Sequence, residues 1–395
     1  MEIKKINAES VKDSRGEKTI QIVVRTSKGR FVASSPSGKS KGKFEVKSYA
    51  KSLDGDISYI NNLDVERING LGIDSFEDLK YIETMVFRDI GGNSLFALEA
   101  SILKALAAER GKELWEFLSE KEIRKINIRP VGNAIGGGLH SCGVKGRKPD
   151  FQEFLFIPNC KRFSDCIKIN KRVYRLAKKL LKARKRNDEG AWETNLSNQQ
   201  VLIIMKNIQK KIKEKYGKKV DIGVDVAASS FYKNGHYIYK NPKEKKDKEN
   251  NLEYISNLVN AFGLHYIEDP LDENDFLGFR EMSKRMRGRC LIVGDDLIAT
   301  NPARLKNAIK MKSVNAVVVK PNQIGSLLEV KEVVNICKKN RIKTVMSHRS
   351  GETKDDTIAD LAVGFECDFF KAGIYGKVRK SKLNRIIEIE RKILS

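Results

Sequence analysis

The chain has 395 residues, 40% of them hydrophobic, which is ordinary for a folded globular protein and long enough for two or three domains, one of them a complete barrel. It carries 76 Lys and Arg against 51 Asp and Glu, a net charge of +25 that attracts polyanions but does not define a fold. Because the lysines are scattered along the sequence, we interpret this charge as a solvated basic surface.

Membrane, secretory and disulfide-based classes are not indicated. No apolar run reaches membrane-spanning length, and the first residues lack the apolar stretch of a signal peptide. The six cysteines form no C-x-x-C pair, so they predict reduced core residues rather than a zinc or redox motif. We therefore expect a cytoplasmic protein with no membrane partner.

The N-terminal third predicts a separate α+β domain. Residues 19–25 alternate as in a strand, Gly29 marks a turn, and residues 31–34 form the next strand. Between residues 75 and 120, apolar residues such as Phe96, Leu103 and Leu106 recur at helical spacing. Strands followed by helices favour an α+β unit, which we place at residues 1–123, with the second domain at 124–395.

The second domain opens with two predicted strands and a basic helix. Residues 126–135 form a strand that leads into Gly136-Gly137-Gly138-Leu139-His140, a backbone kept slim for close approach. Residues 151–157 form another strand, and residues 163–186 a long basic helix. Residues 240–250 are a charged, solvated loop or helix start.

Six short apolar runs between residues 220 and 371 each end in a residue that can bind a metal, a proton or a phosphate. These residues are Asp225, Glu268, Asp295, Lys320, His348 and Lys371. Most of the spacings match one buried strand and one returning helix, and parallel strands buried on both faces are continuously apolar. A closed ring of such strands places all six residues on one rim, where barrel active sites lie. The chain is therefore predicted to be an enzyme.

The residue types at this rim indicate a metal and a base. Asp225, Glu268 and Asp295 are hard oxygen ligands of the kind that magnesium prefers, and they repel one another without a cation. Lys320 ends the most apolar run; burial and neighbouring cations lower a lysine pKa from about 10.4, which suits a base. Lys371 fits a base, an anion clamp or a counter-ion equally well.

A second segment at the rim suits a phosphate. Residues 347–353 combine a strand end, an Arg, Ser hydroxyls and a Gly turn, and we expect free backbone N–H groups there. Ser37-Gly38-Lys39-Ser40 does not form a phosphate-binding P-loop, because that motif needs a Gly at position 33, which is Ala.

In chain order, these segments resemble the motifs of the enolase family over nearly the whole length. The matching segments are Asp13–Gly16, Pro36–Gly42, Asn133–His140, Gln152–Phe154, Asp188–Gly190, Asp225–Tyr232, Ile267–Pro270, Gly294–Leu297, Lys320–Gly325 and Ser347–Thr353. The resemblance implies an α/β fold: an N-terminal α+β domain followed by an enolase-type β/α barrel whose first units are irregular. A long excursion after the Asp225 strand would explain the 43-residue interval to Glu268.

The resemblance also implies a reaction: the reversible dehydration of 2-phosphoglycerate to phosphoenolpyruvate, with two Mg²⁺ in each active site. By matching position, the metal ligands would be Asp225, Glu268, Asp295 and, for the second ion, Ser40 in a mobile loop. Lys320 would be the base and Glu189 the acid, with His140 and Glu153 beside them. The residues that contact the substrate would be Ser40, Gln152, His348, Arg349, Ser350 and Lys371.

Departures from the family pattern leave alternatives open. Lys39 and Lys41 make the loop more basic, and Ser230 replaces a family Glu. Gln21 stands where the family's dimer uses an acid, so the resemblance leaves a homodimer undecided. One alternative is a paralogue acting on another 2- or 3-hydroxy carboxylate. The other is a basic scaffold that binds nucleic acid non-specifically without turnover.

Overall fold

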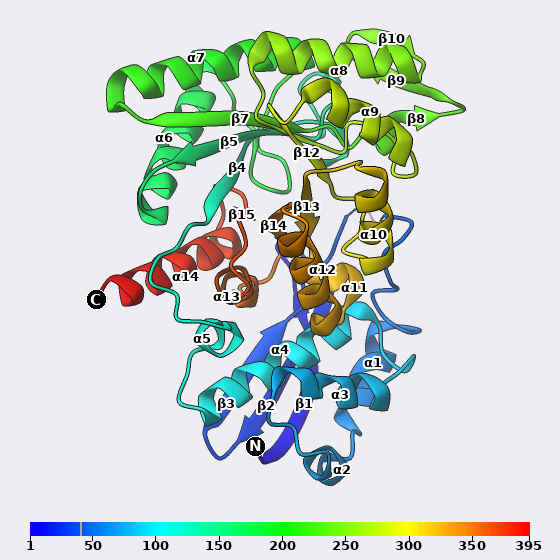
Figure 1. Cartoon of the computed structure of the whole chain (residues 1–395), viewed down its shortest axis with the longest axis vertical. Coiled ribbons are helices and arrows are strands. Elements are labelled where there is room, and N and C mark those ends of the chain that lie inside the picture. Colours follow the sequence, from blue (N-terminus) through cyan, green and yellow to red (C-terminus); the bar gives the residue numbers. More distant parts are fainter. Residues whose placement is uncertain (40–41) are drawn as a thin grey trace.

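The computed structural model describes residues 1–39 and 42–395, and its N-terminal part is a three-stranded antiparallel sheet covered by helices (Figure 1). The sheet consists of β1 (Ile3–Lys12), β2 (Lys18–Thr26) and β3 (Gly29–Ser34) in that order, which confirms the two predicted strands. The helical segments that follow are α1 (Leu53–Asn61), α2 (Val65–Gly70), the 3₁₀ turn η1 (Phe76–Asp78), α3 (Leu79–Met85), α4 (Gly92–Glu109) and α5 (Leu114–Leu118). Helix α4 packs on β2 and β3 and is buried along most of its length.

The C-terminal part is a closed barrel of eight strands, because the last strand pairs with the first. The strands are β4 (Arg129–Gly136), β5 (Glu153–Asn159), β7 (Lys219–Asp225), β11 (Tyr266–Glu268), β12 (Leu291–Gly294), β13 (Ala316–Val319), β14 (Lys343–Ser347) and β15 (Phe369–Lys371). They pair in this order and β15 also pairs with β4. Strand β5 is antiparallel to both of its neighbours, whereas the other pairs of the ring are parallel. The irregular first units are thus confirmed.

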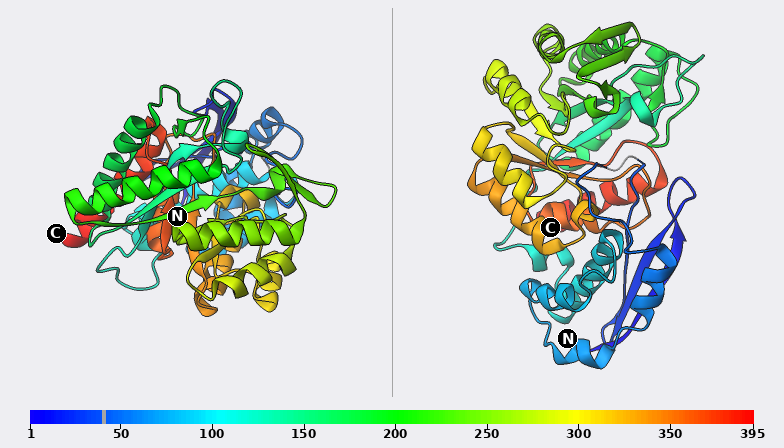
Figure 2. Two further views of the ribbon diagram at one scale, coloured as in Figure 1. Left: turned by 90° about the horizontal axis from the view of Figure 1, so that it is seen from above. Right: turned by 90° about the vertical axis from the view of Figure 1, so that its right-hand side faces the viewer.

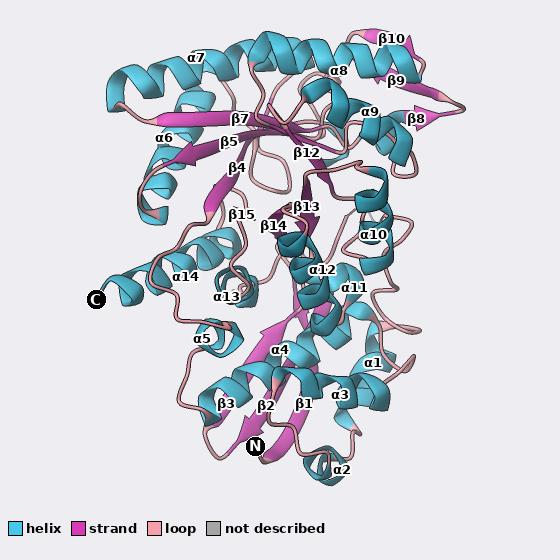
Figure 3. Ribbon diagram, in the orientation of Figure 1, coloured by secondary structure: helices cyan, strands magenta, loops and turns pink. Residues whose placement is uncertain are grey.

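Helices surround the strands on the outside (Figures 2 and 3). They are α6 (Phe163–Leu181), α7 (Asn198–Tyr216), α8 (Lys248–Phe262), α9 (Phe276–Met286), α10 (Pro302–Met311), α11 (Pro321–Ile324), α12 (Leu327–Lys339), α13 (Thr357–Gly364) and α14 (Lys377–Leu394). The short strand β6 (Trp192–Glu193) pairs with the end of β4, and the 3₁₀ turn η2 (Gly138–His140) follows that end. The interval between Leu118 and Arg129 contains the boundary placed after residue 123, which stays a prediction.

The barrel strands are buried on both faces, which is why their sequences are continuously apolar. In β13, Ala316 and Val318 belong to the small cluster that fills the barrel, whereas Val317 and Val319 belong to the large cluster beneath the helices. Successive side chains of a strand point to opposite faces, so both faces need apolar residues here. The same packing places the polar residues at the strand ends, outside the apolar interior.

The 43-residue interval between β7 and β11 contains an added sheet. After β7 come the 3₁₀ turn η3 (Ala228–Phe231) and the antiparallel strands β8 (Tyr232–Lys233), β9 (His236–Lys240) and β10 (Lys243–Lys246). Part of the segment 240–250 is therefore a strand and not a loop, because residues 243–246 pair with β9. The basic helix is also shorter than predicted: α6 ends at Leu181, and Lys182 adopts a left-handed conformation that terminates it.

Two expectations about the whole chain can be compared with the structure. All six cysteines are free, as expected, but only four are buried: Cys142 is exposed and Cys160 is partly buried, so the expectation of core residues is wrong for these two. Within residues 1–39 and 42–395, no helix is both long enough and apolar enough to cross a membrane. The cytoplasmic location stays a prediction.

Candidate active site

One cavity at the carboxyl ends of the strands gathers the residues predicted from the apolar runs. Asp225, Asp295, Lys320, His348 and Lys371 all line it. The sixth residue, Glu268, is fully buried behind the lining and contacts Lys371. Parallel strands of a closed barrel end on one rim, so residues up to 146 positions apart in sequence meet there.

Glu153 reaches the same rim from the opposite strand direction. It is the first residue of β5, and it pairs in register with Asp225, the last residue of β7. Because β5 is antiparallel, the start of this strand lies beside the ends of its neighbours. Glu153 therefore escapes the pattern of apolar runs that end in a functional residue. Only the family resemblance identified it.

Lys371 is the counter-ion of three buried carboxylates. Its Nζ lies 2.8 Å from Glu268 Oε1, 3.1 Å from Glu153 Oε2 and 3.3 Å from Asp225 Oδ2. Burial alone would lower the pKa of Lys371, but these carboxylates raise it well above its usual value. Of the three roles that the sequence leaves open, the contacts support the counter-ion and not a base.

The same carboxylates crowd one another enough to retain protons. Burial, and then the charge of Asp225, raise the pKa of Glu268 to about 8. Such a group of hard oxygen donors gains from a second cation beyond Lys371, so the donor chemistry fits a divalent ion such as Mg²⁺. The group of carboxylates as a whole suits a divalent ion. Which of them would be ligands stays a prediction.

The three predicted metal ligands divide between two lysines. Asp225 and Glu268 share Lys371, whereas Asp295 forms an ion pair with Lys320. Asp295 is also grouped with Asp269 and Asp296, with one carboxylate oxygen of each lying within 4.8 Å of the others. Sequence analysis assigned no role to Asp269.

Asp269 fixes the backbone of this acidic group. Its side chain accepts hydrogen bonds from the backbone N–H of Asp295 (3.0 Å) and of Asp296 (2.7 Å). Asp269 itself has a left-handed backbone with φ of 41°. Burial and the neighbouring Asp295 raise the pKa of Asp296 to about 7, which again shows like charges held close together.

The expectation of a lowered lysine pKa at Lys320 is wrong for this structure. Burial does act in that direction, but the Asp295 carboxylate outweighs it, and the net pKa of Lys320 is raised. Lys320 is thus a charged ammonium while Asp295 is ionised and unshared. A cation bound to the Asp295 carboxylate would weaken its attraction for Lys320, lower the pKa of Lys320 and favour the neutral amine.

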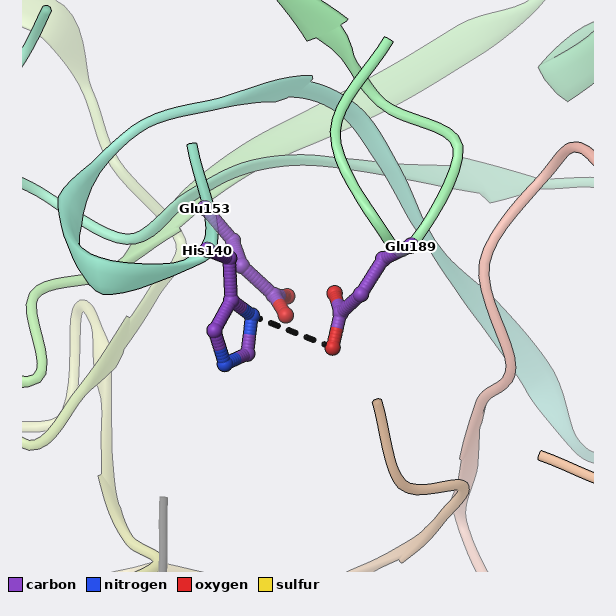
Figure 4. A group of neighbouring side chains, drawn as sticks. All are labelled: His140, Glu153 and Glu189. Atoms are coloured by element: carbon purple, nitrogen blue, oxygen red, sulfur yellow. Dashed lines mark ion pairs between the residues drawn. The ribbon is translucent and has the colours of Figure 1, made fainter. Parts of the chain in front are cut away.

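A second cluster consists of His140, Glu153 and Glu189 (Figure 4). His140 Nδ1 lies 3.2 Å from Glu189 Oε1, and Asn133 Nδ2 donates to Glu189 Oε2 at 3.1 Å. Burial opposes both charges of this pair, but mutual attraction wins: it raises the pKa of His140 and lowers that of Glu189 well below its usual value. Burial raises the pKa of Glu153 well above its usual value. The contact with His140 therefore favours the ionised form of Glu189, whereas at Glu153 burial favours the protonated form and Lys371 opposes it.

The glycines before His140 allow this cluster to form. A Cβ on Gly136 would lie 2.3 Å from Asn187 Nδ2, and one on Gly137 would lie 2.3 Å from the carbonyl oxygen of Phe151. Both distances are too short for any side chain, so the prediction of a slim backbone is confirmed. The loop that holds Glu189 can then pack directly against the end of β4.

The predicted phosphate segment keeps its side chains but not its free backbone donors. The N–H groups of His348, Arg349 and Gly351 donate to Lys371 O, Glu352 Oε1 and Ser37 O, respectively, so the expectation of free donors is wrong for these three. The Arg349 guanidinium is held by Glu45, with Nη2 2.9 Å from both carboxylate oxygens. Arg349 and Ser350 line the cavity with Gln152, and the structure brings all three to the site.

Some contacts at the site were not predicted from the sequence. Glu45 reaches Arg349 from the N-terminal part, and the buried Arg379 of α14 donates to Ser350 O at 3.0 Å. Lys39 Nζ lies 2.9 Å from Asp188 Oδ2, next to Glu189. Each of these positions lies outside the strand-end pattern, so the apolar runs did not point to them. Ser40, predicted to bind both substrate and metal, lies outside the described residues.

The fold and this rim define a class of protein: a barrel enzyme with a capping N-terminal domain and a strongly acidic active site. Comparisons with known families and proteins agree. Residues 3–118 match the family model "Enolase, N-terminal domain", and residues 126–395 match "Enolase, C-terminal TIM barrel domain".

Curated relatives match along their whole length. The chain is 36% identical to a protein named Enolase from Picrophilus torridus, covering 100% of this chain and 99% of that one. It is 36% identical to Enolase of Thermoplasma acidophilum (98% of each chain) and 34% identical to Enolase of Methanosphaera stadtmanae (100% and 98%). The chain belongs to the enolase family and is an enolase-type lyase.

Proposed function

We propose that the chain catalyses the reversible dehydration of 2-phosphoglycerate to phosphoenolpyruvate with Mg²⁺. The observation that carries the proposal is the arrangement of two charged clusters around one cavity: Lys320 with the acidic group at Asp295, and His140 with Glu153 and Glu189. Elimination of water from a carboxylate needs a base at the carbon acid and a proton donor at the leaving hydroxyl. The curated relatives are named for this family, which supports the same chemistry.

Residues of the acidic group are proposed to hold the metal. Asp225, Glu268 and Asp295 are the proposed ligands of the first ion, with Asp269 and Asp296 beside Asp295. Divalent ions on a substrate carboxylate stabilise the charge that develops when its α-proton leaves, as is described for the enolase superfamily in general. The remaining steps depend on the side chains of the chain itself.

Lys320 is proposed to take the proton, and the Glu189 cluster to return one to the leaving hydroxyl. In the described arrangement Asp295 keeps Lys320 charged. Lys320 can therefore act as a base only when another cation neutralises the Asp295 carboxylate. His140, whose Nδ1 lies 3.2 Å from Glu189 Oε1, is proposed to supply the proton that Glu189 passes to the hydroxyl. Glu189 can therefore serve as the acid after a neighbouring side chain transfers a proton to it.

Arg349 and Ser350 are proposed to bind the phosphate. The guanidinium has the planar geometry that matches phosphate oxygens, and Ser350 Oγ is held by Arg15 Nη1 at 3.1 Å and by the N–H of Lys39 at 2.8 Å. Because Glu45 already holds Arg349, a phosphate must share this guanidinium or displace Glu45.

One observation favours a second substrate class. Ser230, which stands where the family has Glu, lines the cavity, and Lys39 adds a charge near the acid loop. These changes support a paralogue acting on another 2- or 3-hydroxy carboxylate. A scaffold without turnover is not supported, since the chain is an enolase-type enzyme.

A direct spectrophotometric assay tests the proposal. The purified chain is incubated with 2-phosphoglycerate, with and without Mg²⁺, and phosphoenolpyruvate is measured by absorbance. Lys320→Ala is expected to reduce kcat by about 10²–10⁴-fold, the usual contribution of a general base. Lys312→Ala, at the end of α10, is the matched control and should leave kcat unchanged. Absence of turnover in the unaltered protein, or faster turnover of an unphosphorylated hydroxy acid, would show that the substrate assignment is wrong.

A further inference from the structure

One face of the barrel, formed by α6, α7 and the turns that follow them, carries most of the net positive charge. Residues 163–186 contain ten Lys and Arg and one Asp, and residues 198–219 contain seven Lys and one Glu. These two segments, which we call the α6–α7 face, thus hold a net +15 of the chain's +25. The basic residues are therefore less scattered than the sequence analysis assumed, while their exposure agrees with the solvated basic surface expected there.

The basic residues of α6 form one continuous stripe. They recur every three or four positions, so they lie on one side of the helix. The opposite side is buried against the barrel and includes Ile167, Val173 and Ala177. At 1.5 Å per residue, the stripe is about 21 Å long. Its members are Lys168, Lys171, Arg172, Arg175, Lys178, Lys179 and Lys182.

Helix α7 adds its own charges to this stripe. The helices pack side by side on the barrel (Figure 1), and the Arg172 guanidinium of α6 lies 3.9 Å from the ring centre of Tyr216 of α7. Lys218, just beyond α7, is close enough to Asp165 of α6 to contribute to the lowering of its pKa. The C-terminal end of α7 therefore extends the basic surface of α6.

Most of these charges have no carboxylate partner. Among the described residues, the ion pairs of the two segments are Lys168–Asp165, Lys210–Glu214 and Lys219–Asp221. Some basic residues elsewhere are well compensated; Arg385, for example, pairs with Asp360, Glu113 and Glu388. Like charges three or four positions apart destabilise a helix. An arrangement that is unfavourable within the chain becomes favourable when an external polyanion neutralises it.

We propose that the α6–α7 face binds the phosphodiester backbone of nucleic acid without base specificity. An extended row of Lys and Arg matches an extended row of phosphates, and Arg presents two donors to each phosphate. A lipid surface fits less well, because helices that bind membranes insert an apolar face. The apolar face of α6 is packed against the barrel, and of the described large apolar side chains exposed on the protein, Ile203 is the one that belongs to α6 or α7.

The test is a titration of a fluorescently labelled 30-nucleotide oligouridylate with the full-length chain, read by anisotropy between 50 and 200 mM KCl. Binding to several phosphates predicts a Kd that rises steeply with salt. A variant carrying Lys171→Glu, Arg175→Glu and Lys179→Glu removes three charges of the stripe. It should raise the Kd at least about tenfold at 100 mM KCl and reduce the slope of log K against log salt by about 2.

The control variant carries Lys4→Glu, Lys5→Glu and Lys28→Glu. It makes the same change in net charge on the N-terminal sheet, at the other end of the molecule (Figure 1). It should change the Kd less than about threefold, and both variants should melt like the unaltered protein. Three results overturn the proposal: no saturable binding, equal losses in the two variants, or tighter binding to phosphatidylserine vesicles at equal phosphate concentration.

Discussion

Replacing Lys371 with Met should destabilise the folded protein strongly, because it removes the counter-ion of three buried carboxylates. The Lys371 side chain is 4% exposed, and those of Glu153, Asp225 and Glu268 are 3%, 4% and 0% exposed. Breaking a buried ion pair by removing one partner costs about 3–5 kcal/mol. We expect a loss of this size in the free energy of unfolding at pH 8, and a smaller loss at pH 6, where the carboxylates take up protons instead.

Unfolding in urea, followed by circular dichroism, measures this loss. The matched control is Lys343→Met, which breaks the half-exposed pair with Asp368 and should cost less than about 1 kcal/mol. Mg²⁺ at about 100 times its Kd adds about 2.7 kcal/mol by mass action, and it should bind Lys371→Met more tightly because a competing cation is gone. A loss below about 1 kcal/mol, or Mg²⁺ stabilisation no greater than in the unaltered protein, would refute the assignment of Lys371 as counter-ion.

Mg²⁺ should raise the melting temperature more at pH 8 than at pH 5.5, because the raised pKa of Glu268, about 8, means that protons compete with the metal. Without metal, stability changes with pH in the opposite direction. The Glu268 carboxyl stabilises the fold below 4.5, its pKa in the unfolded chain, and this stabilisation is lost as the pH rises to 8. Lys39→Ala, which breaks the half-exposed pair with Asp188, should raise KM up to about fivefold at low salt and change stability by less than about 1 kcal/mol. Gly351→Ala should cost about 1–3 kcal/mol, because its Cβ would lie 2.0 Å from an oxygen of Asp13.

Each of these expectations has its own counter-result. Equal Mg²⁺ stabilisation at both pH values would show that protons do not compete at the carboxylates. A KM effect of Lys39→Ala that persists in 0.5 M KCl would exclude an exposed ion pair, since salt screens such charges. Gly70→Ala is the control for Gly351→Ala, because a Cβ at Gly70 meets no atom within 4 Å. If both alanine variants melt alike, close packing at Gly351 is not responsible.

Apolar patterning along the chain was enough to predict the barrel and most of its rim. Runs such as Ala316–Val319 must be buried on both faces, and only a parallel sheet covered by helices buries them so. The residue after each run then has to lie on the common rim. The motifs beyond those runs, including Glu189 and Gln152, came from the family resemblance, and their catalytic roles are still predictions.

Which charges face each other could not be predicted from these patterns and follows from the folded chain. The antiparallel strand β5 brings Glu153 beside Asp225, and Glu45 of the N-terminal part reaches Arg349. Lys320 lies against Asp295, which reverses the pKa shift expected for a buried lysine. The physical reason is that the burial of a strand is visible in the apolar pattern of its own sequence. Electrostatics depends on distances between residues far apart in the chain, which only the closed fold sets.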